Sequence, residues 1–248
     1  KMTSYESQDF YLLKRYDDVA MLKLGKNFLS KLIDLAIENP LPYVFEHIEE
    51  NDEIKALVIM NCPEKMGPEE YIYFFRQVIA NEPERNSIHR LCNIFDQLIL
   101  NIVGLNKLVI HTDCGEVIPL FLNMSLACDY RIVATHTIFQ KPYFELGMLP
   151  KGGGAFFLCK MLGNSKTRQL LESEKEINAI EALELGIVDQ VVPYKDLEKA
   201  AIQLALRLSN RSIRSLAGIK RLINYSLKDL KEYLSFENQE IVRIIGAF

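Results

Sequence analysis

The sequence lacks long apolar runs, and this absence argues against a membrane-spanning protein. No stretch reaches the roughly 18 apolar residues that span a bilayer. Its first residues, KMTSYESQDFYLLK, lack the apolar segment of a signal peptide and are too acidic for a transit peptide. We therefore expect no membrane contact and a cytoplasmic location. Internal repeats, low-complexity tracts and flexible linkers are also missing.

Cysteine and histidine are too few and too scattered for a disulfide framework or a metal site. The chain has five cysteines, no CxxC pair, and four histidines that do not cluster at ligand spacing. We expect free buried thiols and no metal. The net charge of −4 gives no basis for binding nucleic acid. The cysteines are Cys62, Cys92, Cys114, Cys128 and Cys159.

What is present is an ordinary globular composition, with 49% apolar and 25% charged residues in 248. Residues 10–25 predict two short strands around an Asp-Asp turn. Compact apolar runs at 54–61 and 107–113 have the length of buried parallel strands, and 130–139 is a third strand-like run. The chain is long enough for one large domain or for a domain with an appended helical part.

Helical patterns separate these strands. Residues 28–51 predict one or two helices, and 68–105 is a long helical tract. Pro119 stands where proline is allowed, in the first turn of a helix candidate that continues to Asp129. From about Ser165 onward we expect only helices. Strands alternating with helices predict an α/β domain with right-handed crossovers.

Four segments occur in an order that resembles the crotonase (enoyl-CoA hydratase/isomerase) superfamily. They are IKALVIMN (54–61), KLVIHTDCG (107–115), SLACDYRIVATHTIFQKPYFELGMLPKGGG (125–154) and INAIEALELGIVDQVVP (177–193). The resemblance covers roughly residues 10 to 230. It implies a spiral of ββα units over residues 1–190, followed by a helical trimerisation region over 191–248. A homotrimer or hexamer is the implied assembly.

The resemblance also implies a ligand and a site. Family members bind acyl thioesters, usually of coenzyme A, which acts as substrate carrier and not as a separate cofactor. Two backbone N–H groups hold the thioester oxygen in an oxyanion hole. Their matching positions are Gly67 and Leu120. At the second position, the family's run of three glycines is replaced by Pro119, Leu120 and Phe121. A first-turn N–H can still donate, whereas Leu120 and Phe121 fill space beside the substrate or simply pack into the core.

The two acid/base glutamates of the family's hydratases match Asn123 and Tyr143. Neither an amide nor a tyrosine of ordinary pKa, about 10, replaces a carboxylate base. We therefore do not expect two-glutamate hydration. Asn123 could bind a substrate carbonyl, carboxylate or water, and Tyr143 could donate to an anion or act as a weak acid.

Other candidates have weaker support. Glu145 is either a substrate-binding group or an exposed loop carboxylate, and Lys26 is either a contact to coenzyme A or a surface lysine. We expect His111 to be a buried histidine with satisfied hydrogen bonds and Asp129 to be structural. The run KGGG at 151–154 lacks the spacing of a phosphate loop and predicts a tight turn into a helix.

Three functions remain open at this point. The first is an enzyme that decarboxylates, isomerises or cleaves an acyl-CoA through an enolate, using the oxyanion hole without the glutamate pair. The second is an enzyme whose acyl group arrives on an acyl carrier protein. The third is a non-catalytic scaffold or thioester-binding subunit that keeps the fold.

Overall fold

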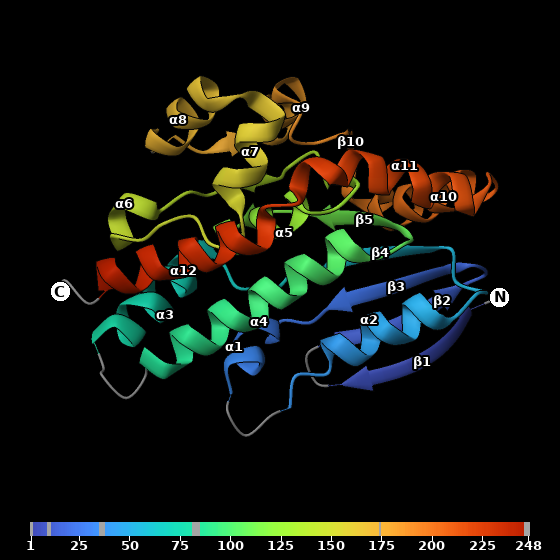
Figure 1. Cartoon of the computed structure of the whole chain (residues 1–248), viewed down its shortest axis with the longest axis horizontal. Coiled ribbons are helices and arrows are strands. Elements are labelled where there is room, and N and C mark those ends of the chain that lie inside the picture. Colours follow the sequence, from blue (N-terminus) through green and yellow to red (C-terminus); the bar gives the residue numbers. More distant parts are fainter. Residues whose placement is uncertain (1, 9–10, 35–37, 81–84, 174, 246–248) are drawn as a thin grey trace.

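The centre of the protein is a seven-stranded sheet with the order β1-β2-β3-β4-β5-β7-β10 (Figure 1). The computed structural model describes residues 2–8, 11–34, 38–80, 85–173 and 175–245. The first three strands pair antiparallel, and every later pair, from β3–β4 to β7–β10, is parallel. The strands of this sheet are β1 (Met2–Gln8), β2 (Tyr11–Tyr16), β3 (Val19–Leu24), β4 (Ala56–Asn61), β5 (Leu108–Asp113), β7 (Tyr130–Ala134) and β10 (Gln190–Val192).

Strand β4 shows why this sheet is covered on both faces. All six residues of its sequence ALVIMN are buried. Val58 packs into the hydrophobic cluster on one face of the sheet, while its neighbours Leu57 and Ile59 pack into the cluster on the other. Because side chains alternate along a strand, a continuous apolar run requires a layer of helices on each side.

Helix α10 (Leu197–Ser209) supplies the layer on the Val58 face, where Leu197, Ala201 and Leu204 join its cluster. The opposite face is covered by α1 (Phe28–Ile33), α2 (Leu41–Glu50), α4 (Arg85–Gly104) and α5 (Pro119–Leu126), whose residues share the larger cluster with Leu57 and Ile59. Figure 1 shows α2 and α4 lying in front of the sheet.

The remaining elements lie around this core. A second, three-stranded sheet has the order β6-β8-β9. Its strands are β6 (Glu116–Val117), β8 (Ile138–Phe139) and β9 (Ile177–Asn178). The other helices are α3 (Pro68–Ala80), α6 (Tyr143–Leu146), α7 (Gly154–Leu162), α8 (Asn164–Glu172), α9 (Ala179–Leu185), α11 (Ile213–Asn224) and α12 (Leu230–Ile245), with short 3₁₀ turns at Tyr194–Asp196 and Tyr225–Leu227. Within the described ranges, none of the helices is both long and apolar enough to cross a bilayer.

Most sequence-based expectations for local structure are confirmed. Strands β2 and β3 form a hairpin around Asp17, whose φ of 52° is tolerated by aspartate in tight turns. Pro119 is the first residue of α5, and the 28–51 segment contains two helices. The KGGG run is a turn into α7, in which Gly152 and Gly153 have φ of 87° and 75°.

Two expectations about strands were wrong. The chain after Ser165 is not wholly helical, because β9 and β10 lie within it and β10 pairs parallel with β7. The run 130–139 is not one strand but two, β7 and β8, which belong to different sheets. Strands of two or three residues are too short to show a period of two, so these pairings are set by tertiary contacts.

Asp129 is structural, as expected. Its Oδ2 accepts a hydrogen bond from the backbone N–H of Val109 at 2.7 Å and pairs with Lys220 Nζ at 2.9 Å. The buried Lys220 also donates to the carbonyls of Ile102 and Lys107. One ion pair therefore ties α11 to the end of α4 and to the start of β5.

Replacing Asp129 by alanine should destabilise the protein by about 3 kcal/mol, because the Lys220 ammonium would remain buried without its counter-charge. Urea denaturation measures this loss. Arg168→Ala, in the exposed Arg168–Glu172 pair, is the matched control and should cost less than about 1 kcal/mol. Equal losses in the two variants would show that the buried pair has no special weight.

Candidate active site

A buried polar cluster lies where β4 and β5 end. Lys65 Nζ pairs with Asp113 Oδ1 at 2.7 Å and also donates to the Cys114 carbonyl, and Asn61 Nδ2 donates to Asp113 Oδ2. Both charged side chains are almost fully buried. The cluster ties the loop after β4, which leads to Gly67, to the segment after β5, which leads into α5. The carboxyl ends of parallel strands are where open α/β sheets usually place their sites.

Gly67 immediately precedes α3, and its N–H donates to the carboxylate of Glu70 at 3.0 Å. Open space surrounds the position where a side chain at Gly67 would lie. A ligand oxygen that binds this N–H must displace the Glu70 carboxylate. Glu70 is exposed, so water can take over the solvation of its carboxylate.

Leu120 is the second residue of α5. The Ile118 carbonyl accepts hydrogen bonds from the N–H groups of Phe121 and Leu122, and the Leu120 N–H lies at the positive end of the helix dipole. The side chains of Leu120 and Phe121 are both buried in the main hydrophobic cluster. For Phe121 the structure supports packing into the core, the alternative to lining an open substrate pocket.

Asn123 is 1% exposed and is held by the loop before α7. Its Nδ2 donates to the Lys151 carbonyl at 2.7 Å, which fixes the orientation of the amide. Its Oδ1 has no hydrogen-bond partner among the described residues. A Cβ at Gly154 would lie 2.4 Å from that oxygen, so glycine is required there. Asn123 therefore offers a fixed acceptor, not a freely rotating amide.

Tyr143, the first residue of α6, lies beside Asn123 and is also buried. Burial raises the pKa of its phenol well above the ordinary value; the nearby Asn123 amide opposes this shift, and the Glu237 carboxylate adds to it. The phenol is thus neutral at physiological pH. The structure brings together the two residues that stand at the family's glutamate positions, and neither of them carries a charge.

A buried ionic network stands behind this pair and was missed by the sequence analysis. Lys151 Nζ pairs with Asp96 of α4 and, at 3.1 Å, with Glu237 of α12. The Glu237 carboxylate also accepts hydrogen bonds from the N–H groups of Gly152 and Gly153, at 2.7 and 3.1 Å. The only available sequence signal was Lys151 in the KGGG run, because Glu237 lies in an amphipathic helix with no distinguishing motif.

Glu145 and Lys26 do not join this site. Glu145 is exposed and pairs with Arg76 of α3 at 2.9 Å, which agrees with the surface-carboxylate alternative. Lys26 is exposed in the turn between β3 and α1, and its role in binding coenzyme A stays a prediction. Its neighbour Lys23 is engaged by Glu198 at 2.5 Å.

Among the residues that the structure describes, no group of three histidine, cysteine or acidic side chains is placed to hold a metal ion. All five cysteines are free, with Cys62 and Cys159 only half-buried.

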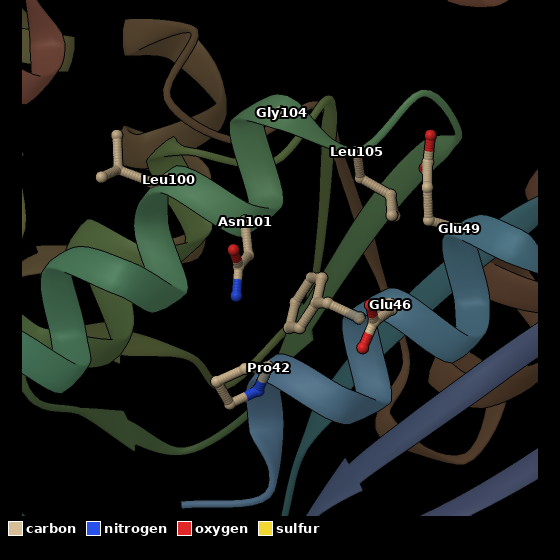
Figure 2. Close-up of a pocket in the computed structure, with 8 residues that line it drawn as sticks. Pro42, Glu46, Glu49, Leu100, Asn101, Gly104 and Leu105 are labelled. Atoms are coloured by element: carbon tan, nitrogen blue, oxygen red, sulfur yellow. The ribbon is translucent and has the colours of Figure 1, made fainter.

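A separate pocket of about 500 Å³ lies between α2 and α4 (Figure 2). Pro42, Leu100 and Leu105 give it apolar walls, and Glu46 and Glu49 stand at its rim. The Glu49 carboxylate is already bound by the backbone and side chain of Asn106. The residues lining this pocket include none of the predicted site residues, so we do not assign it to the active site.

Comparison with known proteins identifies the family. A family model described as enoyl-CoA hydratase/isomerase matches residues 16–245. The chain belongs to the enoyl-CoA hydratase/isomerase family. Among curated relatives, the trans-2-decenoyl-(acyl-carrier-protein) isomerase of Streptococcus mutans is 26% identical, over 88% of this chain and 83% of its own. The short-chain-enoyl-CoA hydratase of Clostridium acetobutylicum is 23% identical, over 92% and 86%.

Solved structures confirm the crotonase fold expected from the sequence. The enoyl-CoA hydratase of Bacillus halodurans superposes with a TM-score of 0.81 at 19% identity, covering 96% of this chain and 95% of its own. A structure of Pseudomonas aeruginosa DspI gives 0.74 at 20% identity, covering 99% of each chain. At these identities the likeness establishes the fold of this family member and not its reaction.

His111 of β5 is buried, as expected, but it is not satisfied: neither ring nitrogen has a hydrogen-bond partner among the described residues. Burial lowers its pKa to about 4, with the charges of Lys65 and Arg131 adding to the effect and that of Asp113 opposing it. The folded protein therefore holds this ring neutral at a pH where an unfolded chain would protonate it.

Acid should therefore weaken the fold through His111. Its folded pKa of about 4 lies below the ordinary value of about 6.5, so stability is unaffected above pH 6.5 and is lost as pH falls toward 4, by up to about 3 kcal/mol. Denaturation of His111→Asn at several pH values should show a flatter acid limb than wild type. His136→Asn, at an exposed histidine, should follow the wild-type curve. A parallel loss in all three proteins would contradict the assignment.

Proposed function

We propose that this family member decarboxylates an acyl-CoA that carries a carboxylate on its α-carbon. The observation that carries the proposal is the buried pair of Asn123 and Tyr143, in which burial keeps the phenol protonated and no carboxylate stands at either position. Hydration needs carboxylates to position water and move protons. Moving a double bond also needs a base that takes a proton from carbon, and a neutral tyrosine cannot be one.

Decarboxylation needs no such base. The bond between the α-carbon and the carboxylate breaks, carbon dioxide leaves, and the electron pair forms the thioester enolate. The N–H groups of Gly67 and Leu120 would stabilise the enolate oxygen. Tyr143 would then transfer its proton to the α-carbon, because a thioester enolate is a far stronger base than a phenolate, and solvent would restore the phenol.

Turnover of 2-carboxyacyl-CoA compounds of the malonyl type tests this reaction. Tyr143→Phe should lower kcat by about 10²- to 10⁴-fold, the usual weight of an acid/base group. Tyr73→Phe, at an exposed tyrosine of α3, should leave kcat unchanged. Rapid hydration or isomerisation of 2-enoyl-CoA compounds by the wild-type protein, without decarboxylation of any malonyl-type compound, would overturn the proposal.

Two alternatives have their own observations. The Streptococcus mutans relative is named for an acyl-carrier-protein substrate, which favours a carrier-bound acyl group. A non-catalytic thioester-binding subunit is favoured by the Gly67 N–H bound to Glu70 and by the buried Leu120 and Phe121. An acyl-pantetheine panel separates these cases: carrier-type activity would appear with pantetheine alone, and binding without turnover would indicate the subunit.

We also propose that the chain assembles as a homotrimer or a hexamer through its C-terminal helical region. Helix α11 exposes Ile219, Leu222 and Ile223, with exposed fractions of 53%, 79% and 67%, and Tyr225 follows directly. Residues three and four apart share a helix face. Large apolar side chains gathered on one exposed face are typical of a protein–protein interface.

Charge on this face should prevent assembly. Leu222→Glu combined with Ile223→Glu should shift sedimentation velocity at micromolar concentration from the assembled species to the monomer, because burying two unpaired carboxylates is costly. Tyr43→Glu, at an exposed aromatic residue of α2, should leave the assembly unchanged. A wild-type protein that sediments as a monomer would contradict the proposed assembly.

A further inference from the structure

The buried ionic network of Lys151, Asp96 and Glu237 joins three distant elements beside Asn123. Three elements far apart in sequence converge on one loop: α4 through Asp96, α12 through Glu237, and the loop itself through Lys151. All three side chains are largely buried, and Asp96 is further held by Asn238 Nδ2 at 2.6 Å. Figure 1 shows α12 lying beside α4.

The loop contact that matters is made by backbone atoms. Glu237 binds the N–H groups of Gly152 and Gly153, so the peptide units after Lys151 are held from one side. On the other side the Lys151 carbonyl accepts the hydrogen bond from Asn123 Nδ2. The ammonium and the carbonyl of one residue thus connect the ionic network to the amide in the active site.

We propose that Lys151 and Glu237 are positioning residues, which hold the loop so that the Lys151 carbonyl fixes the side-chain amide of Asn123 beside Tyr143. Their relevance to catalysis rests on the function proposed above, but the positioning itself does not. The hydrogen bond to the loop fixes the Asn123 amide, and its oxygen has no hydrogen-bond partner among the described residues.

The position of the charges supports this assignment. Burial raises the pKa of the Asp96 and Glu237 carboxyls, Lys151 opposes both shifts, and Glu237 contributes to the raised pKa of Tyr143. The network therefore fixes the neighbour of Tyr143 and also favours its protonated form. An ion pair that served stability alone would need neither contact with the loop backbone nor proximity to the site.

The experiment reads the Asn123 amide directly and needs no substrate. In ¹⁵N-labelled protein the side-chain NH₂ resonance of Asn123 is assigned by its loss in Asn123→Ser. Its hydrogen exchange should be slow in the wild type, because Nδ2 is buried and bonded to the Lys151 carbonyl. Glu237→Gln keeps an acceptor for the loop N–H groups but removes the charge that attracts Lys151. Glu237→Gln should therefore speed hydrogen exchange of the Asn123 NH₂ group by about threefold. The double variant Lys151→Met with Glu237→Gln should speed it by about tenfold or more.

The matched control lies on the same helix. Arg243→Met with Glu240→Leu removes an exposed pair of α12 and should leave the Asn123 exchange rate at its wild-type value. If the double variant at Lys151 and Glu237 fails to fold, Glu237→Gln alone decides, since it leaves the Lys151–Asp96 pair intact. An unchanged Asn123 resonance and exchange rate in folded Glu237→Gln protein would overturn the positioning role.

Activity then separates this inference from the proposed function. If the wild type decarboxylates a thioester, Glu237→Gln should lower kcat with little change in KM, because the bound acyl group does not need Glu237. A loosened Asn123 amide in a protein that turns over no thioester would support the positioning and reject the decarboxylase. If Glu237→Gln loses turnover while the Asn123 amide is undisturbed, the result would support the decarboxylase and reject the positioning role.

Discussion

Charge in the interior of this protein must be paired, and much of its architecture depends on how that pairing is achieved. An unpaired ammonium in an apolar core costs several kcal/mol, so a buried lysine needs a partner. Lys107 and Lys141 are held by backbone carbonyls, and three other buried lysines are paired with carboxylates. Lys65 takes Asp113, Lys151 takes Asp96 and Glu237, and Lys220 takes Asp129. Each pair joins segments that are distant along the chain. The pairs at Lys65 and Lys151 also border the candidate active site, so its geometry follows from the same requirement.

The candidate site keeps the backbone segments expected to carry the N–H donors, but it has different side chains at the family's two glutamate positions. Members of this family share the fold, and here the first turn of α5 and the loop before α3 remain as possible sources of N–H donors. The two side chains at the family's glutamate positions are the buried amide of Asn123 and the buried phenol of Tyr143. A neutral, pre-oriented pair suits the proposed decarboxylation, in which the substrate supplies its own electrons. The paired carboxylates of a hydratase would instead have to exchange protons with water repeatedly.

The sequence allowed the sheet and the central pair to be predicted, because both have local patterns. Apolar runs such as IKALVIMN specify buried strands, and ordered motifs place Asn123 and Tyr143 on adjoining segments. The network of Lys151 and Glu237 could not be predicted, since 86 positions separate the two residues and no periodicity links them. The three residues of β10 were missed for a similar reason: so short a strand is defined by its partner and not by its own composition.

Strand β10 also has a consequence for how the chain is made. It covers the outer edge of β7, where Asp189 N–H binds the Arg131 carbonyl and Thr135 N–H binds the Val192 carbonyl. A ribosome releases the polypeptide from its N-terminus, so β7 emerges well before its partner and presents unpaired backbone groups in the interval. Exposed edges of that kind recruit other strands. Until residues 190–192 are released, a nascent chain therefore presents this edge of β7 without its partner.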